Sequence, residues 1–465
     1  MPVRPTLLVP SLRALRAAAV LSLGMLFVAA ATAQSYAQGR VPIVRDAEIE
    51  ALVRDYARPI LRAAGLSKSG IDIVLVNDNS FNAFVVGRRM FINTGALLQS
   101  ETPNEIIGVI AHEAGHIAGG HQNRLREQLE RAQTMALVST LLGIGAVVAG
   151  AAAKSGELAQ AGSGIAAGGG EVARRGLLQY QRGEETAADR SAVTYLETTG
   201  QSTKGMLITF DRLQRSLTLS GVRIDPYQVS HPMPRERIAN LETLARASPN
   251  FDKTDPAALQ LRHDMMRAKI AVYTQGGQVP AKLRKSNPIA AQYGDAHATY
   301  LRGNPRNALA KTDALIKQQP KNAYLYELRG DILMKANKPR DAAAAYATAI
   351  KLDPAKSGTL RIAYGQALLA SGGADSLKKA IDSINEGLAK DRENILGYRY
   401  LAQAYGQLGE VPEAELATAE GHFYGGNYQQ AKIFAARAQQ KFKPGSPGWL
   451  RAQDIINYKV ARKKG

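Results

Sequence analysis

A repeat in the C-terminal part of this 465-residue chain limits its fold more than any other sequence feature. The segments NPRNALAKTDALIKQQP and KPRDAAAAYATAIKLDP, which begin at Asn304 and Lys338, align at an interval of 34 residues. Four positions match in type: Pro305 with Pro339, Ala308 with Ala342, Ile316 with Ile350, and Pro320 with Pro354. Such a unit is a helix-turn-helix that cannot bury its own apolar face, so neighbouring units must stack. We therefore expect an α-solenoid over residues 288–465.

The interval of 34 residues is the period of the tetratricopeptide repeat. Further units follow less regularly through Ala380, Ala414 and Ala431. Stacked repeats form a concave surface that binds segments of partner proteins, and we expect that role here. The alternative is a purely structural role, in which the repeats only cover the preceding domain. The basic stretch 279–288 is the expected linker in front of them.

The stretch AHEAGHIAGGH at residues 111–121 holds three of the seven histidines of the chain. Apolar residues at helical spacing predict a helix here, so His112 and His116 lie one turn apart on the same face and can reach one metal ion. This is the HExxH pattern of zinc proteases. Glu113 lies about 100° round the helix, where it can act as general base towards a water molecule that zinc makes more acidic. The sequence therefore predicts one Zn²⁺ ion, and the alternative is an incidental pair of histidines on a solvated helix.

Two residues compete to be the third zinc ligand. His121 is close in the sequence, but on a continued helix it would point about 180° away from the metal. The longer pattern HExxHxxGxxH would need a histidine at position 122, where this chain has glutamine. In YQRGEETAADRSAVTYL, Glu185 is the better candidate, because Asp189 follows one turn later and can accept the ring N–H of a ligand histidine. Glu184 has no carboxylate at that spacing, so we expect Glu185 to complete the zinc site.

The segments HEAGHIAGGH and RGEETAAD resemble the motifs of the M48 family of zinc metallopeptidases, in which HExxH is followed by a further histidine and by an ExxxD helix. The segment SHPMPRERI is similar to a third element of that family. The resemblance implies that His231 approaches the zinc or stabilises the tetrahedral oxyanion, and that Asp189 and Arg237 support the site. The fold class that it implies is mainly α, with a zincin-type (gluzincin) α+β domain that contains a small sheet, followed by the solenoid.

Upstream of the zinc motif, FNAFVVGRRMFINTGALL has the pattern of a β-hairpin that turns at Gly87. Its residues Asn82, Ala83 and Phe84 are similar to an edge strand of M48 proteins, against which an extended substrate can pair through its backbone. The alternative is an ordinary hairpin that covers the helical core.

The N-terminal segment carries arginines, then an apolar run, and then Ala31-Thr32-Ala33. This pattern predicts a secretory signal peptide over residues 1–33, with an uncleaved membrane anchor as the alternative. Because the chain has no cysteine, we expect neither a lipid at the cut site nor disulfides, and we place the protein in a Gram-negative periplasm. The net charge of +19 is scattered, which favours anionic lipid, lipopolysaccharide or acidic partners over nucleic acid.

Residues 135–170, between the two zinc motifs, are apolar or rich in Gly and Ala, and the run over 135–153 is nearly long enough to cross a bilayer. A single crossing would put His116 and Glu185 on opposite sides of the membrane, and the sequence has no matched second span. We therefore expect a pair of helices that lies on a membrane or forms a lid over the active site. A hairpin buried inside the protease domain is the alternative.

These features predict a signal peptide over 1–33, an M48-type protease domain over 34–270 and repeats over 288–465. The order resembles that of periplasmic M48 proteases. It implies an endopeptidase that degrades misfolded outer-membrane β-barrel proteins, including a lipopolysaccharide translocon component, and assists their assembly while its repeats dock on the barrel-assembly machinery. Two alternatives stay open: a non-proteolytic chaperone or scaffold with structural zinc, and an integral-membrane M48 protease. Glu113 argues against the first, since a structural zinc needs no general base.

Overall fold

The computed structural model describes residues 42–153, 155–220, 231 and 235–459, so the predicted signal peptide lies outside the described residues. Two compact units make up this part of the chain. The first contains strand β1 (Ile43–Val44) and Val53–Gln260, and the second contains Arg45–Leu52 and the chain from Leu261 onwards. The division after Gln260 lies before the boundary that we placed at 270.

The first unit contains a four-stranded mixed sheet in the order β1-β2-β4-β3. Its other strands are β2 (Asp72–Val76), β3 (Ala83–Val86) and β4 (Arg89–Asn93). β2 and β4 are parallel, whereas β3 and β4 form the expected antiparallel hairpin, in which Phe84 pairs with Phe91. The hairpin turns at Gly87, whose φ of 62° suits a residue without a side chain. β3 therefore forms one edge of the sheet.

The helices of this unit are α3 (Thr94–Gln99), α4 (Pro103–Gly119), α5 (His121–Ala152), α6 (Gly156–Thr198), α7 (Lys204–Ser220) and α9 (Arg235–Arg246), together with the greater part of α2 (Ala47–Ala63). α3 contacts β4 and α4 contacts β3, and the predicted zinc motifs lie in α4 and α6. α4 begins with a capping box between Thr102 and Glu105 and ends at Gly120, whose φ is 67°. The HExxH motif lies in the second half of α4, where His112 and Glu113 are buried and His116 is in the last turn. The predicted helix is confirmed, and it ends directly before His121.

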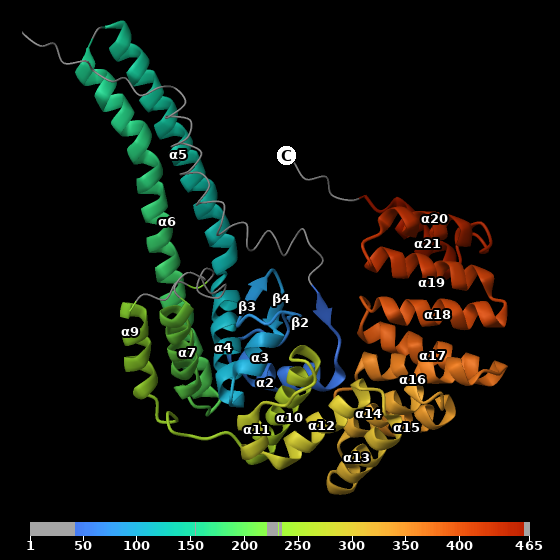
Figure 1. Cartoon of the computed structure of the whole chain (residues 1–465). Helices are drawn as coiled ribbons and strands as arrows, with labels where there is room; N and C mark the ends of the chain where they lie inside the picture. Colours follow the sequence, from blue (N-terminus) through green and yellow to red (C-terminus); the bar gives the residue numbers. More distant parts are fainter. Residues whose placement is uncertain (1–41, 154, 221–230, 232–234, 460–465) are drawn as a thin grey trace, which may run out of the picture. The chain divides into compact units, whose positions relative to one another are not determined.

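α5 and α6 form a long antiparallel hairpin that projects from the rest of the unit (Figure 1). The expected pair of helices is confirmed, and α6 brings the chain back so that the two zinc motifs lie at the same end. The alternative, a hairpin buried inside the protease domain, is wrong, since these apolar side chains of the hairpin are exposed: Met135, Leu137, Val138, Leu141, Leu142, Ile144, Val148, Leu158, Ile165 and Val172. In the described part of the chain, His121–Ala149 is the one stretch long and apolar enough to cross a membrane, and hardly any of it is buried.

The second unit is a run of helices in which, from the second helix onwards, each helix packs on the next. They are α10 (Ala257–Thr274), most of which belongs to this unit, α11 (Ala281–Ser286), α12 (Pro288–Leu301), α13 (Pro305–Gln318), α14 (Ala323–Lys335), α15 (Pro339–Leu352), α16 (Gly358–Ser371), α17 (Ala374–Lys390), α18 (Ile395–Leu408), α19 (Val411–Tyr424), α20 (Tyr428–Gln439) and α21 (Pro447–Asn457). The matched prolines 305 and 339 begin α13 and α15, and the matched alanines 308 and 342 are fully buried. The predicted solenoid is confirmed. The basic stretch 279–288 forms α11 and the start of α12 rather than an open linker.

A buried group of charges holds the start of α2 within the second unit. Lys269 Nζ lies 2.7 Å from Asp46 Oδ2 and 3.3 Å from Glu48 Oε2. Tyr293 Oη donates a hydrogen bond of 2.6 Å to the same Glu48 oxygen. Burial disfavours the charged form of Lys269, but the attraction of Asp46 outweighs it and raises the pKa of the lysine well above its usual value. Lys269 therefore stays protonated at neutral pH, while burial raises the pKa of Glu48 above its usual value.

We expect Lys269→Met to lower the free energy of unfolding by about 3–5 kcal/mol, because it leaves two carboxylates buried without their cation. Lys311→Met is the matched control, since Lys311 pairs with Asp295 on the surface, and it should cost about 1 kcal/mol or less. Denaturant unfolding of the mature chain measures both. Equal effects of the two substitutions would contradict a stabilising role for the buried group.

Candidate metal centre

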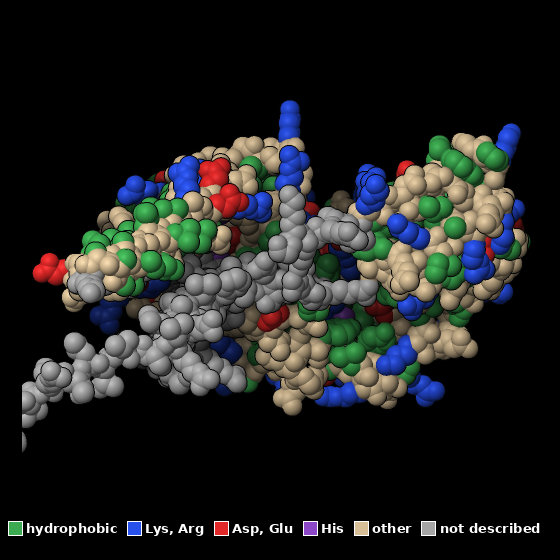
Figure 2. All heavy atoms as spheres, turned by 90° about the horizontal axis from the view of Figure 1, so that it is seen from above, with side chains coloured by type: hydrophobic (Ala, Val, Ile, Leu, Met, Phe, Trp, Pro, Cys, Tyr) green, Lys and Arg blue, Asp and Glu red, His purple; other side chains and the backbone are tan. Residues whose placement is uncertain are grey.

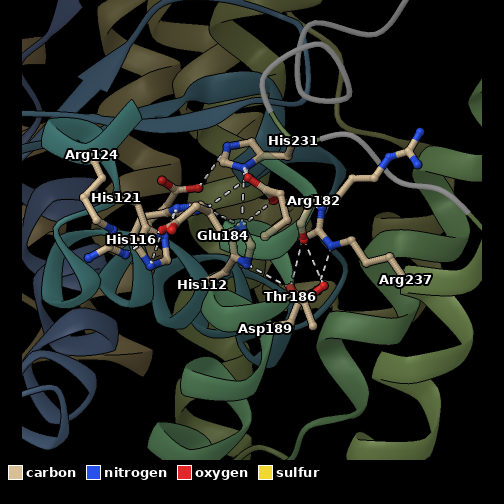
Figure 3. Close-up of polar contacts among 12 residues, drawn as sticks. His112, His116, His121, Arg124, Arg182, Glu184, Thr186, Asp189, His231 and Arg237 are labelled. Carbon is tan, nitrogen blue, oxygen red and sulfur yellow. Dashed lines mark hydrogen bonds and ion pairs between the residues drawn. The ribbon is translucent and has the colours of Figure 1, made fainter. Parts of the chain in front are cut away.

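Four side chains converge at the junction of α4 and α6: His112, His116, Glu185 and His231. One nitrogen or carboxylate oxygen from each lies within 4.8 Å of the other three (Figure 3). The Nε2 atoms of His112 and His116 are 3.0 Å apart. His231 Nδ1 lies 3.3 Å from His112 Nε2 and 3.2 Å from Glu185 Oε1. The structure thus brings together the three predicted ligands and adds His231 to the same cluster.

This cluster fits a zinc ion in both chemistry and size. Imidazole nitrogen and carboxylate oxygen are ligands that zinc prefers, at bond lengths of about 2.0–2.2 Å in a tetrahedron. Ligand atoms at the corners of such a tetrahedron are roughly 3.3 Å apart. Glu185 Oε2 lies 3.3 Å from His112 Nε2, and Glu185 Oε1 lies 3.3 Å from His116 Nε2, so the carboxylate is close enough to share an ion with both histidines.

Asp189 and Arg237 contact the side of the cluster that faces away from the candidate ligand atoms. Asp189 Oδ1 lies 3.0 Å from His112 Nδ1, which is the contact that the spacing of Glu185 and Asp189 predicted. Arg237 donates to both Asp189 oxygens at 2.7 and 2.9 Å, and its Nη1 lies 2.8 Å from Glu185 Oε2. Burial alone would raise the pKa of Asp189, but Arg237 and His112 outweigh it and lower that pKa. Both carboxylates are therefore ionised and oriented.

The two histidines of HExxH differ in their protonation. Burial disfavours charge on His112, but its hydrogen bonds to Asp189 and Glu185 raise its pKa to about 9. Burial lowers the pKa of His116 to about 3. His116 is therefore neutral at pH 7, as a metal ligand must be, whereas a metal ion would replace a proton at His112.

Glu113 lies beside the cluster without belonging to it. It is almost fully buried, and its Oε1 lies 3.4 Å from His231 Nε2. Burial raises the pKa of Glu113 above its usual value, although the nearby histidines oppose this. A raised pKa suits a carboxylate that must accept a proton and release it again.

His121 corrects one expectation from the sequence. We expected a continued helix that turns His121 away from the metal, but α4 ends and α5 starts a new direction at Gly120. As a result, His121 Nδ1 lies 2.8 Å from His116 Nδ1. The rejected ligand candidate Glu184 is 2.9 Å from His121 Nε2 and is not part of the metal cluster. The signal for this arrangement was the pair Gly119-Gly120, since glycine commonly ends a helix.

The predicted substrate strand lies at the sheet edge against α4. Asn82 is buried, and its carbonyl accepts a hydrogen bond of 3.0 Å from Asn93 N. Phe84 stacks on Phe91 with 4.9 Å between ring centroids. One end of the outer edge is covered by Gln122, whose side-chain amide donates to the carbonyl of Val85 and accepts from Gly87 N at 2.9 Å. No pattern in the sequence predicts this contact of Gln122.

Comparisons with known proteins agree with the motifs. Residues 44–245 match peptidase family M48, and residues 293–357 and 328–392 match the tetratricopeptide repeat. The beta-barrel assembly-enhancing protease of Escherichia coli (strain K12) is 25% identical over 428 residues, which cover 88% of this chain and 82% of that protein. The putative beta-barrel assembly-enhancing protease of Vibrio cholerae is 24% identical over 420 residues, which cover 87% and 82%. M48 metallopeptidases are zinc-dependent, in keeping with the donor set found here.

We expect the mature protein to bind one zinc ion and Arg237→Met to weaken that binding by about 10–100-fold, because Glu185 and Asp189 lose the cation that orients them. Arg246→Met on the same helix is the control, since Arg246 pairs with Glu242 on the surface. Competition with a chromogenic chelator measures the affinity. Identical affinities of the two variants would contradict the supporting role of Arg237.

Proposed function

We propose that this chain, a metallopeptidase with an M48 domain and tetratricopeptide repeats, is an exported zinc-dependent endopeptidase for misfolded outer-membrane proteins. The observation that carries the proposal is the buried cluster of His112, His116, Glu185 and His231 with Glu113 beside it. A structural zinc needs only ligands, whereas a carboxylate next to the ligands serves hydrolysis.

In the proposed mechanism, His112, His116 and Glu185 hold zinc, which when bound supplies a Lewis acid for the peptide carbonyl and for water. Glu113 takes the proton of the attacking water on its carboxylate and returns it to the nitrogen of the leaving amine. His231 Nδ1 lies 3.3 Å from His112 Nε2 and 3.2 Å from Glu185 Oε1, where it would occupy the space next to a metal ion. A substrate carbonyl therefore requires His231 to move, after which its imidazole can donate to the developing oxyanion.

Strand β3 is the proposed substrate-binding element. It is an edge strand, and an extended peptide can pair with the outer backbone groups of Ala83 and Val85. Because Gln122 covers the carbonyl of Val85, pairing would extend from there towards Asn82. Unpaired strands of a misfolded β-barrel protein have the extended backbone that such an edge requires.

The substrate class and location come from the relatives. Two relatives that align with most of this chain are named for enhancing β-barrel assembly. We therefore place this protein in the periplasm after removal of the predicted signal peptide, with the repeats docked on the barrel-assembly machinery. The solenoid supports this, since stacked repeats bind partner proteins.

We expect Glu113→Gln to abolish casein cleavage while zinc content stays at one ion, because the amide cannot accept the proton. Glu127→Gln, an exposed change on α5, should leave cleavage unchanged. His231→Ala tests whether this residue blocks access, in which case cleavage increases. Zinc bound without cleavage in wild type and Glu113→Gln alike would favour the alternative, a non-proteolytic chaperone with structural zinc.

We also propose that the α5–α6 hairpin touches the membrane surface. Hydrophobic side chains gather along the hairpin in Figure 2, and the sequence between 132 and 170 contains only two charged residues, Lys154 and Glu157. Charged residues of both signs flank this apolar part: Arg126, Glu127, Glu130 and Arg131 on α5, and Glu171, Arg174 and Arg175 on α6, where both arginines pair with Glu171. An apolar tip with a charged base fits the surface of a bilayer.

We expect the mature protein to float with vesicles of phosphatidylethanolamine and phosphatidylglycerol, and the change of Leu137, Leu141 and Leu142 to Ser to remove this binding, because burial of each leucine in lipid contributes about 1.5–3 kcal/mol. Leu396→Ser with Leu450→Ser is the control, since both leucines are exposed in the second unit. Equal flotation of both variants would contradict the proposal. Resistance to alkaline extraction would instead favour the integral-membrane alternative.

A further inference from the structure

Each histidine of HExxH has a partner at the ring nitrogen that faces away from the cluster. For His112 this partner is Asp189, which Arg237 holds. For His116 it is a second histidine, His121, with 2.8 Å between the two Nδ1 atoms. The outer ring nitrogen of His112 thus contacts a carboxylate, whereas that of His116 contacts an imidazole.

The contact between His116 and His121 determines where both rings carry their protons. His116 directs Nε2 into the cluster, so a ligand role there leaves its hydrogen on Nδ1. That N–H donates to His121 Nδ1, which must accept with its lone pair. His121 therefore carries its own hydrogen on Nε2, 2.9 Å from Glu184 Oε2, to which it donates.

Arg124 completes this chain of contacts at the protein surface. Its Nη2 lies 2.7 Å from the same Glu184 oxygen, and its Nε donates to Tyr180 Oη at 3.2 Å. Arg124 also donates to the carbonyl of Gly119, at the corner between α4 and α5. In Figure 3 the side chains of Arg124, His121 and His116 follow one another towards the cluster. His121 thus contacts a carboxylate that an arginine holds, just as His112 contacts Asp189, which Arg237 holds.

The glycine corner is what allows this arrangement. A Cβ atom on Gly119 would lie 2.1 Å from His121 Nε2 and 2.4 Å from its Cδ2, so any larger residue displaces the ring. Gly120 has a φ of 67°, which side chains disfavour. The chain therefore turns at a point where glycine alone keeps His121 against His116.

We propose that His121, backed by Glu184 and Arg124, is a positioning residue that fixes the tautomer and ring orientation of His116 and so strengthens zinc binding without being a ligand. The inference rests on the proposed function, because it takes the cluster to hold zinc. Partners of this kind commonly change metal affinity by about 10–100-fold.

The test is zinc affinity by chelator competition, together with the absorption spectrum of the cobalt-substituted protein. His121→Phe keeps the ring volume but cannot accept the hydrogen bond, and we expect its zinc dissociation constant to rise about 10–100-fold. His121→Gln should restore most of the affinity, since its carbonyl oxygen can accept from His116. Gly119→Ala should resemble His121→Phe, and His422→Phe in the second unit is the control.

The cobalt spectrum of His121→Phe should keep the shape of the wild-type spectrum, because the ligands are unchanged. A dissociation constant within twofold of wild type would overturn the proposal. So would a spectrum altered like that of His116→Ala, which would make His121 a ligand. Equal losses in His121→Phe and His121→Gln would also overturn it, since a packing role does not need an acceptor. A wild-type protein that binds no zinc would instead refute the proposed function.

Discussion

The metal site depends on how closely helices α4 and α6 approach each other. At their contact, a Cβ atom on Gly115 would lie 2.9 Å from the carbonyl oxygen of Ala188 and 3.1 Å from its Cα. The two backbones therefore touch at the glycine inside HExxH. This contact sets Glu185 and Asp189 against the histidine face of α4, because both lie within one turn of Ala188. A wider separation would leave the carboxylate of Glu185 out of reach of His116 Nε2.

The close packing of α4 and α6 also brings several carboxylates together in a buried place, where opposite charges must compensate them. Glu113, Glu185 and Asp189 are all nearly fully buried, and isolated carboxylates in such a place would be strongly disfavoured. Arg237 binds two of them, and His112 lies between the same two. Glu113 has no arginine at bonding distance among the described residues, and burial raises its pKa. The same balance of charges therefore keeps Glu185 ready for a metal ion and makes Glu113 a better proton acceptor.

The sequence predicted what local geometry determines. His112, His116, Glu185 and Asp189 stand in pairs four residues apart, and helical periodicity alone places each pair on one face. The position of His121 depends on the left-handed backbone conformation of Gly120, which ends α4. Helical periodicity assumes that the helix continues, so it could not predict where His121 lies. The pair of helices between the zinc motifs was predicted, but the apolar pattern over 135–170 could not decide between an exposed and a buried hairpin. The start of α2 belongs to the second unit through Glu48 and Lys269, 221 positions apart, and no short-range pattern reports such a pair.

The hairpin and the metal site are parts of the same two helices. His121 is the first residue of α5, and Glu184, Glu185 and Asp189 lie in the last third of α6. The hydrogen bond between His121 and Glu184 thus crosses the base of the hairpin, while the apolar side chains lie towards its far end. A helix transmits a change of direction along its length, because its backbone hydrogen bonds resist bending. A change in the angle between α5 and α6 would therefore alter the distance from His121 to Glu184, one hydrogen bond away from the candidate ligand His116.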